Sequence, residues 1–260
     1  MKLREVSDVH SEFYGEDEIA RISLRILPPL PDDHNTVLLL AGDIGSMSRP
    51  ECLVNFLDAV CPRFDTVLYI PGNHESYGGD IQTTPDKIRA LTKHIPNIYF
   101  NHAANAPITG RNTRIHMHTL WTDFDKENPM SMYEAGERMN DYRLIRNGGY
   151  VLSPQDTLEF HKEHLAILED DILPGDIVMT HHTPSLQCIP TEYADDRVNG
   201  AYHSDLEDLI IRKKPSYWFC GHTHTAKTLK IGDTTVIINP HGYGKHYTKN
   251  GYNPLLVVEI

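Results

Sequence analysis

The chain has 260 residues, of which 40% are hydrophobic and 23% charged, and its formal net charge is -12 at pH 7. This composition is typical of a globular protein with a full core, in one domain or at most two. The acidic balance argues against a protein that binds long nucleic acid by neutralising phosphates, although bound cations would still permit a small phosphorylated substrate.

We expect neither a targeting signal nor a disulfide framework in this chain. No apolar run approaches the roughly 20 residues that span a bilayer, and residues 1–7 lack the apolar core of a signal peptide. The cysteines show neither CxxC spacing nor a disulfide-dense pattern: Cys52, Cys61, Cys188 and Cys220. We therefore expect a cytoplasmic protein with free thiols and no membrane contact.

The first half of the chain predicts strands that alternate with helices. Residues 36–41 form an apolar run, which is typical of a parallel strand buried on both faces. Residues 11–34 are polar, then Pro-rich, and indicate a surface excursion with one short strand near 22–26. The remaining expected elements are strands at 2–7, 66–70, 97–100 and 113–120 and helices at 49–60 and 85–94. This alternation favours an α/β fold.

The second half begins with its least regular region, residues 121–150, which we interpret as a lid over the site or as a surface excursion with a helix at 133–141. Ser153 followed by Pro154 signals a helix start. Further elements are expected as a helix at 204–212 capped by Ser204 and strands at 176–180, 216–220, 226–231, 234–239 and 255–260. A turn at Gly232-Asp233 indicates a hairpin and an antiparallel edge. We predict one domain over residues 1–260, a four-layer α/β/β/α sandwich of two mixed sheets with flanking helices.

Side chains that can bind a metal follow five of the predicted strands. Because open α/β sheets bind ligands at the carboxyl ends of their strands, we expect these side chains to converge. They are Asp8, His10, Asp43, Asn73, His181, His222 and His224. Carboxylate, imidazole and amide donors suit divalent manganese, iron or zinc. Seven donors are too many for one tetrahedral ion, so they predict two ions that share one carboxylate.

Five sequence blocks resemble those of the calcineurin-like metallophosphoesterases and occur in the order of that family. They are D-x-H at Asp8 and His10, G-D at Gly42-Asp43, G-N-H-E at Gly72 to Glu75, T-H-H at Thr180 to His182, and G-H-T-H at Gly221 to His224. The blocks extend from residue 8 to residue 224, so the resemblance covers most of the chain.

The resemblance implies a role for each matching side chain. The first metal would be bound by Asp8, His10 and His224, and the second by Asn73, His181 and His222, with Asp43 bridging. His182 remains the alternative to His181, which is preferred because the family's ligand directly follows the strand. His74 would be the catalytic histidine, stabilising the phosphoryl group or protonating the leaving oxygen. A hydroxide bridging the two metals would attack phosphorus in line.

One departure from the family pattern bears on the substrate. Protein phosphatases of the family usually have an Asp-Arg pair shortly after G-D, whereas residues 44–49 here read I-G-S-M-S-R. Arg49 or Arg143 could substitute for that arginine. The departure favours the branch of small bacterial and phage-like phosphodiesterases, which the blocks at 119–124, 139–146 and 239–243 also resemble.

Residues outside the motifs leave open alternatives. Arg143 is a candidate phosphate ligand because a guanidinium offers a planar fork, and a salt bridge to Asp141 is the alternative. His241 is a candidate substrate contact in the turn at 239–242. Two further pairs of histidines lie outside the motifs. His116 and His118 are expected to be structural or exposed, and His161 and His164 are expected to be solvated.

The sequence therefore predicts a phosphoester hydrolase that uses two divalent metal ions. A phosphodiesterase acting on a small nucleotide-like substrate is the preferred function. A phosphomonoesterase, or a nuclease acting on short nucleic-acid ends, would use the same chemistry. A catalytically silent interaction scaffold is the remaining alternative, and such scaffolds typically lose the catalytic histidine or several ligands.

Overall fold

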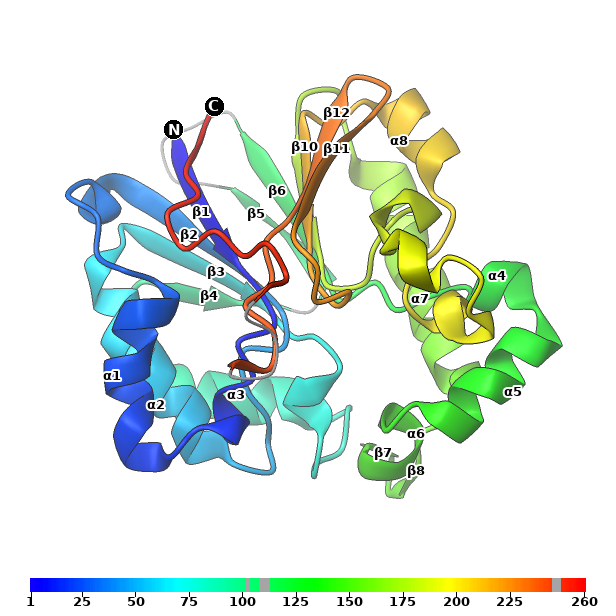
Figure 1. Cartoon of the computed structure of the whole chain (residues 1–260), viewed down its shortest axis with the longest axis horizontal. Coiled ribbons are helices and arrows are strands. Elements are labelled where there is room, and N and C mark those ends of the chain that lie inside the picture. The colour runs from blue at the N-terminus through cyan, green and yellow to red at the C-terminus, as the bar shows by residue number, and fades with distance from the viewer. Residues whose placement is uncertain (102, 108–112, 245–248) are drawn as a thin grey trace.

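The computed structural model describes residues 1–101, 103–107, 113–244 and 249–260, with the backbone alone at 103–107. Two mixed sheets face one another, and helices cover the outer face of each (Figure 1). The predicted α/β/β/α sandwich is thereby confirmed. No helix in the described ranges is both long enough and apolar enough to cross a membrane.

The first sheet has the strand order β13-β1-β2-β3-β4. Strands β1 to β4 run parallel, and β13 pairs with β1 in the antiparallel direction. The bounds are β1 (Lys2–Val6), β2 (Thr36–Ala41), β3 (Thr66–Ile70), β4 (Ile98–Phe100) and β13 (Val258–Glu259). The helices α1 (Glu16–Ile26), α2 (Pro50–Val60) and α3 (Thr84–Thr92) lie on its outer side (Figure 1).

The second sheet has the order β11-β12-β10-β9-β6-β5, with four parallel central strands and an antiparallel strand at each edge. Its strands are β5 (Ala103–Pro107), β6 (Arg114–His118), β9 (Ile177–Thr180), β10 (Tyr217–Cys220), β11 (Lys227–Ile231) and β12 (Thr234–Ile238). The helices α7 (Pro154–Asp171) and α8 (Glu207–Lys213) cover it. The insertion between β6 and α7 holds α4 (Phe124–Glu127), α5 (Pro129–Arg138), α6 (Asp141–Leu144), β7 (Arg146–Asn147) and β8 (Tyr150–Val151).

The apolar run of β2 shows why the sandwich forms. Successive side chains of a strand point to opposite faces. Val37 and Leu39 pack between the two sheets, whereas Leu38 and Leu40 pack against the helices of the outer layer. Because both faces of the strand are covered, every position in it is apolar or buried. The parallel strands end at one rim of the sandwich, and the turns that follow them carry the predicted site.

The short strand expected near residues 22–26 is wrong, because this segment belongs to helix α1. Ile19, Ile22 and Ile26 are spaced three and four residues apart, which places them on one helical face. That face packs against the core of the first sheet. The prolines after residue 27 obscured this helical spacing in a segment interpreted as a surface excursion.

In the second half of the chain, two predicted helix starts differ from the structure and one is confirmed. The helix expected at 133–141 begins earlier, at Pro129, because the Asn128 side chain caps it by accepting the Met130 N–H. Ser204 does not cap α8, which starts at Glu207; its hydroxyl accepts the Asp123 N–H instead. The predicted start of α7 is confirmed, with a reciprocal capping box between Ser153 and Asp156.

The expectation that His161 and His164 are solvated is also wrong, since both are buried. They lie on the face of α7 that carries Leu158 and Leu168, and the Nδ1 of His161 lies 3.2 Å from the carbonyl oxygen of Leu120. The four cysteines are free, as predicted, and the structure places all of them in the interior.

Candidate metal centre

The backbone at the rim adopts an unusual conformation where the predicted ligands lie. Five of the seven have a positive φ: Asp8 (54°), His10 (50°), Asp43 (55°), His222 (69°) and His224 (52°). Residues other than glycine pay a steric cost in this left-handed region, and Asp, Asn and His are the types that enter it most readily. The turns are held by cross-strand backbone bonds, such as Asp8 N–H to Gly42 O and His10 N–H to Asp43 O. The fold therefore directs these side chains inward at a steric cost.

The glycines of the motifs are required because functional side chains fill the adjoining space. A Cβ atom at Gly72 would lie 2.7 Å from the Nε2 of His181, and one at Gly221 would lie 2.6 Å from an oxygen of Asp8. Both distances are shorter than real Cβ contacts. The G-N-H-E and G-H-T-H blocks thus begin with glycine because a ligand from another strand packs against that backbone.

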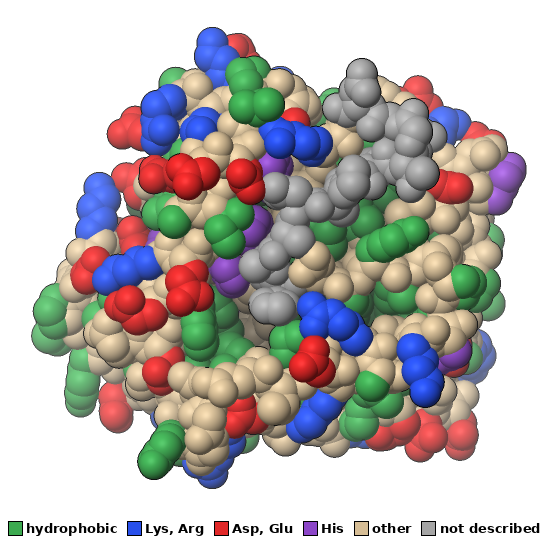
Figure 2. Space-filling view, turned by 180° about the vertical axis from the view of Figure 1, so that it is seen from behind, with side chains coloured by type: hydrophobic (Ala, Val, Ile, Leu, Met, Phe, Trp, Pro, Cys, Tyr) green, Lys and Arg blue, Asp and Glu red, His purple; other side chains and the backbone are tan. Residues whose placement is uncertain are grey.

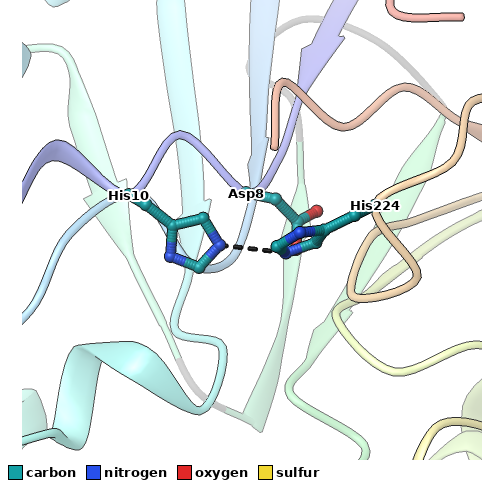
Figure 3. Close-up of side chains that lie close together, drawn as sticks. All are labelled: Asp8, His10 and His224. Atoms are coloured by element: carbon teal, nitrogen blue, oxygen red, sulfur yellow. Dashed lines mark hydrogen bonds and ion pairs between the residues drawn. The ribbon is translucent and has the colours of Figure 1, made fainter. Parts of the chain in front are cut away.

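Three of the predicted side chains, Asp8, His10 and His224, form a first cluster (Figure 3). The Nε2 atoms of His10 and His224 lie 3.0 Å apart, and the Nε2 of His224 lies 3.2 Å from the Oδ1 of Asp8. Asp8 also accepts the backbone N–H of His222, which fixes its carboxylate. The three ligand atoms lie within 4.8 Å of one another, so they can bind one cation.

The other four predicted ligands, Asp43, Asn73, His181 and His222, form a second cluster. The Nε2 of His181 lies 3.0 Å from the Oδ1 of Asn73, 3.2 Å from the Nδ1 of His222 and 3.5 Å from the Oδ2 of Asp43. The same Asp43 oxygen lies 3.9 Å from the Nε2 of His10. Asp43 therefore lies between the two clusters, where the bridging residue is expected.

The chemistry of the second cluster fits a cation. The Nδ1 of His181 donates to the carbonyl oxygen of Ala41 at 2.9 Å, so in the neutral ring Nε2 carries a lone pair. That lone pair faces the acceptor oxygens of Asn73 and Asp43, and a positive charge among them would stabilise this arrangement. Burial lowers the pKa of His181, but the charge of Asp43 outweighs burial and raises this pKa to about 10. A metal ion at this position would offset the same negative charge.

His181, rather than its neighbour His182, points into the second cluster. The ring of His182 packs against that of His222, with centroids 4.3 Å apart, while its Nδ1 lies 3.2 Å from the carbonyl oxygen of Thr119. The geometry favours the assignment preferred from the sequence.

His74 lies beside the clusters and is fixed by Glu12, a residue that the sequence did not single out. The Nδ1 of His74 lies 2.9 Å from the Oε1 of Glu12, and the Nδ1 of His10 lies 3.4 Å from the same oxygen. Burial raises the pKa of Glu12, but these hydrogen bonds outweigh it and lower the pKa to about 2. Burial lowers the pKa of His74, but Asp43 and Glu12 raise it to about 9. By distance alone His74, His10 and Asp43 also form a possible metal group.

Glu75 explains why the G-N-H-E block ends in glutamate. Its buried carboxylate accepts the backbone N–H groups of Gly72, Asp43 and Ile44 at 2.7 to 3.0 Å, and the hydroxyl of Tyr69 at 2.7 Å. One side chain thereby ties the turn after β2 to the turn after β3. Glu75 supports the candidate metal centre through the backbone of these turns.

A cavity of about 630 Å³ lies over the two clusters. Asp43, Asn73, His74, His222 and His224 contribute to its lining. Further lining comes from residues 138–140 of the insertion, from the 189–202 segment, and from Tyr243, Lys249 and Asn250. Figure 2 shows histidine side chains gathered beside a hollow on one face of the molecule. The wall at 189–202 was not anticipated from the sequence.

An ion pair joins two walls of this cavity. Both terminal nitrogens of Arg138 donate to the carboxylate of Asp196, at 2.6 and 3.0 Å. Asp196 also accepts the N–H of Val198, which fixes its position. The insertion and the 189–202 segment are therefore connected over the site by a bidentate contact.

The two residues predicted to contact substrate, Arg143 and His241, are not among the residues that line the cavity in the described part of the chain. Arg143 is exposed and donates to the carbonyl oxygen of Glu137, and in the described lining the insertion contributes Arg138 and not Arg143. Asp141 faces Asn73 and Tyr77 instead of forming the salt bridge considered for Arg143. His241 is half-buried, with its Nδ1 3.1 Å from the carbonyl oxygen of Gly242. Their roles stay predictions.

Two further polar residues are structural. Arg49 donates to the carbonyl oxygens of Glu12 and Tyr14, so it fastens the turn after β1. His116 is buried and its Nε2 lies 2.9 Å from a carboxylate oxygen of Asp176, at the amino end of β9.

This sandwich, with Asp and His clusters at its strand ends, defines a metal-dependent phosphoesterase. The sequence profile of the calcineurin-like phosphoesterases matches residues 1–226, so the chain belongs to that family. It is 27% identical to the uncharacterized protein L509 of Acanthamoeba polyphaga mimivirus over 281 residues, covering 99% of this chain and 96% of that protein.

Two solved structures illustrate the likeness in fold. Phosphopantetheinyl hydrolase (PptH) from Mycobacterium tuberculosis superposes with a TM-score of 0.72 at 18% identity, over 96% of this chain and 92% of that one. The protein TT1561 of Thermus thermophilus gives a TM-score of 0.54 at 13% identity, over 94% and 90% respectively. At these identities the likeness concerns the fold alone.

Proposed function

We propose that this protein hydrolyses a phosphodiester of a small, nucleotide-like molecule with the help of two divalent cations. One observation carries the proposal: two clusters of side chains, with Asp43 between them, lie beneath a cavity of about 630 Å³. This volume falls within the roughly 300–1,000 Å³ of pockets that bind small organic ligands. The net charge of -12 further favours a small substrate over a long nucleic acid.

The ligands divide between two sites, with Asp43 common to both. The first cation would be bound by Asp8, His10 and His224, and the second by the set Asn73, His181 and His222. Manganese, iron and zinc all suit these donors. When bound, such a pair lowers the pKa of a water molecule and neutralises charge that develops on phosphoryl oxygens.

His74 would act on the substrate through its Nε2 atom. Its Nδ1 is engaged by Glu12, and its ring stacks on that of Tyr77 with centroids 4.0 Å apart and planes at 24°. These contacts fix the plane of the imidazole. Held in this way, His74 can donate a hydrogen bond to a phosphoryl oxygen or a proton to the leaving oxygen.

The pairing of one cavity arginine, Arg138, favours a diester over a monoester. A phosphomonoester is largely a dianion near neutral pH, whereas a diester carries a single negative charge. Arg138 is already paired with both oxygens of Asp196, so its charge is offset before any substrate arrives. We propose that residues 138–140, within the lid predicted at 121–150, contact the organic part of the substrate.

The preference is measurable with two chromogenic esters. In the presence of Mn²⁺, we expect kcat/KM for bis(p-nitrophenyl) phosphate to exceed that for p-nitrophenyl phosphate by about tenfold or more, which is a difference of about 1.4 kcal/mol. An Asp43→Ala preparation purified in parallel measures contaminating phosphatase. A higher kcat/KM for the monoester would contradict the proposed diesterase and favour a phosphomonoesterase.

A further inference from the structure

We infer that Asp141 is a positioning residue that orients the Asn73 amide toward the second cation. This inference rests on the proposed role of Asn73 as a ligand. Asp141 is 2% exposed and comes from the insertion, far along the chain from the G-N-H-E block. Its Oδ1 atom accepts from the Nδ2 of Asn73 at 2.8 Å and from the hydroxyl of Tyr77 at 2.6 Å.

The two ends of an asparagine amide are nearly equal in size, so packing alone does not decide which end faces a metal. Hydrogen bonding does decide it, because a carboxylate only accepts. With Asp141 on one side, the Nδ2 of Asn73 faces that carboxylate, and its Oδ1 faces the other way. There the Oδ1 lies 3.0 Å from the Nε2 of His181. A flipped amide would direct N–H groups at the cation and would meet Asp141 with an acceptor.

Asp141 reaches this place because its segment pairs with the chain that follows the G-N-H-E block. The N–H of Gly78 donates to Leu144 O at 3.0 Å, and the N–H of Ile81 donates to Arg146 O at 2.8 Å. The N–H of Arg146 in turn donates to Gly79 O at 2.9 Å. The end of the insertion is thus fastened beside the second cluster.

The same carboxylate also acts on the proposed catalytic histidine. Tyr77 donates its hydroxyl to Asp141 and stacks its ring on His74. Asp141 therefore fixes one proposed metal ligand and the ring that supports His74. Partners that orient a ligand typically change metal affinity by 10–100-fold when they are removed.

The test compares Asp141→Leu with Asp141→Asn, which match in shape and differ in the acceptor. Isothermal titration with Mn²⁺ gives the stoichiometry and both affinities. We expect Asp141→Leu to weaken the second cation about 10–100-fold and to leave the first unchanged. Asp141→Asn retains an acceptor oxygen and is expected to keep most of the affinity. Tyr77→Phe leaves the Asn73 contact intact, so it is expected to lower kcat and to retain both cations.

Asp176→Leu is the matched control. Asp176 is also a buried carboxylate, but its partners are Arg114 and His116, at the end of β9 opposite His181. We expect both cation affinities to survive this change. Wild-type affinities in Asp141→Leu, or an equal loss of both cations in Asp141→Leu and Asp176→Leu, would overturn the inference.

Two further measurements distinguish a failure of the inferred role of Asp141 from a failure of the proposed role of Asn73 as a ligand. If Asn73→Ala still binds two cations with wild-type affinity, the proposed role of Asn73 fails and the inference falls with it. If Asp141→Leu does not fold, the hydrogen bond between Asn73 and Asp141 can be tested in the wild-type chain by NMR. The side-chain amide protons of Asn73 are expected to exchange slowly with solvent, and exchange at the rate of a free amide would overturn the inference.

Discussion

Replacing Asp43 with alanine is expected to abolish binding of both cations and to lower kcat/KM on the order of 10³-fold or more, since metal ions contribute several kcal/mol to such reactions. Asp43 Oδ2 lies 3.5 Å from the Nε2 of His181 and 3.9 Å from that of His10. Its Oδ1 accepts the backbone N–H of His74 at 2.8 Å. Asp43 thus lies near a histidine of each cluster, so its loss is expected to affect both sites.

Metal analysis after gel filtration, together with steady-state kinetics, measures this effect. Asp176→Ala serves as a control for the loss of a buried carboxylate away from the site. Comparable unfolding temperatures of the two variants without metal would show that the loss is local. An Asp43→Ala protein that retains two tightly bound cations and wild-type kcat/KM would contradict the shared role of Asp43.

Replacing His74 with alanine is expected to lower kcat by about 10²–10⁴-fold while both cations remain bound. The reason is that the Nδ1 of His74 is engaged by Glu12 and its ring is held by Tyr77, which leaves Nε2 for the substrate. The measurement pairs kcat for bis(p-nitrophenyl) phosphate with the Mn²⁺ stoichiometry of the same preparation.

The His74→Ala variant also distinguishes the remaining alternatives. Loss of a cation would make His74 a ligand, in line with the possible group that it forms with His10 and Asp43. Unchanged hydrolysis would remove it from the mechanism. Glu12→Gln is an informative companion, because glutamine still accepts a hydrogen bond but no longer carries the charge that favours the imidazolium form of His74.

The predicted ligand residues could be selected from the sequence because each follows an apolar strand within a recognisable block. Strand ends in an α/β fold meet at one rim, so convergence of Asp8, Asp43 and His181 followed from local patterns alone. The positive φ of Asp8 and Asp43 was not foreseeable, because it results from backbone bonds between the turns after β1 and β2.

The supporting residues were missed because they act over long separations in the sequence. Glu12 reaches His74 across 62 positions, and Asp141 reaches Asn73 across 68. Glu12 stands in a polar segment that indicated a surface, and Asp141 was considered only as a partner of Arg143. Neither segment carries a local pattern that would direct its carboxylate inward.

Two parts of the fold could not be predicted from the sequence, because they too depend on contacts between distant residues. Strand β5, A-A-N-A-P, contains no β-branched or aromatic residue, and its pairing with β6 supplies the hydrogen bonds that define it. The wall at 189–202 consists of short 3₁₀ turns, whose position depends on contacts such as that between Asp196 and Arg138. The conformation of both segments therefore depends on tertiary contacts and not on a local sequence pattern.

The most direct test of the account is a crystal grown with Mn²⁺ and measured at the manganese absorption edge. We predict two anomalous peaks roughly 3.5–4 Å apart, one beside Asp8, His10 and His224, the other beside Asn73, His181 and His222, with Asp43 between them. Absence of any peak at these side chains, or a single cation that does not contact Asp43, would contradict the proposed metal centre.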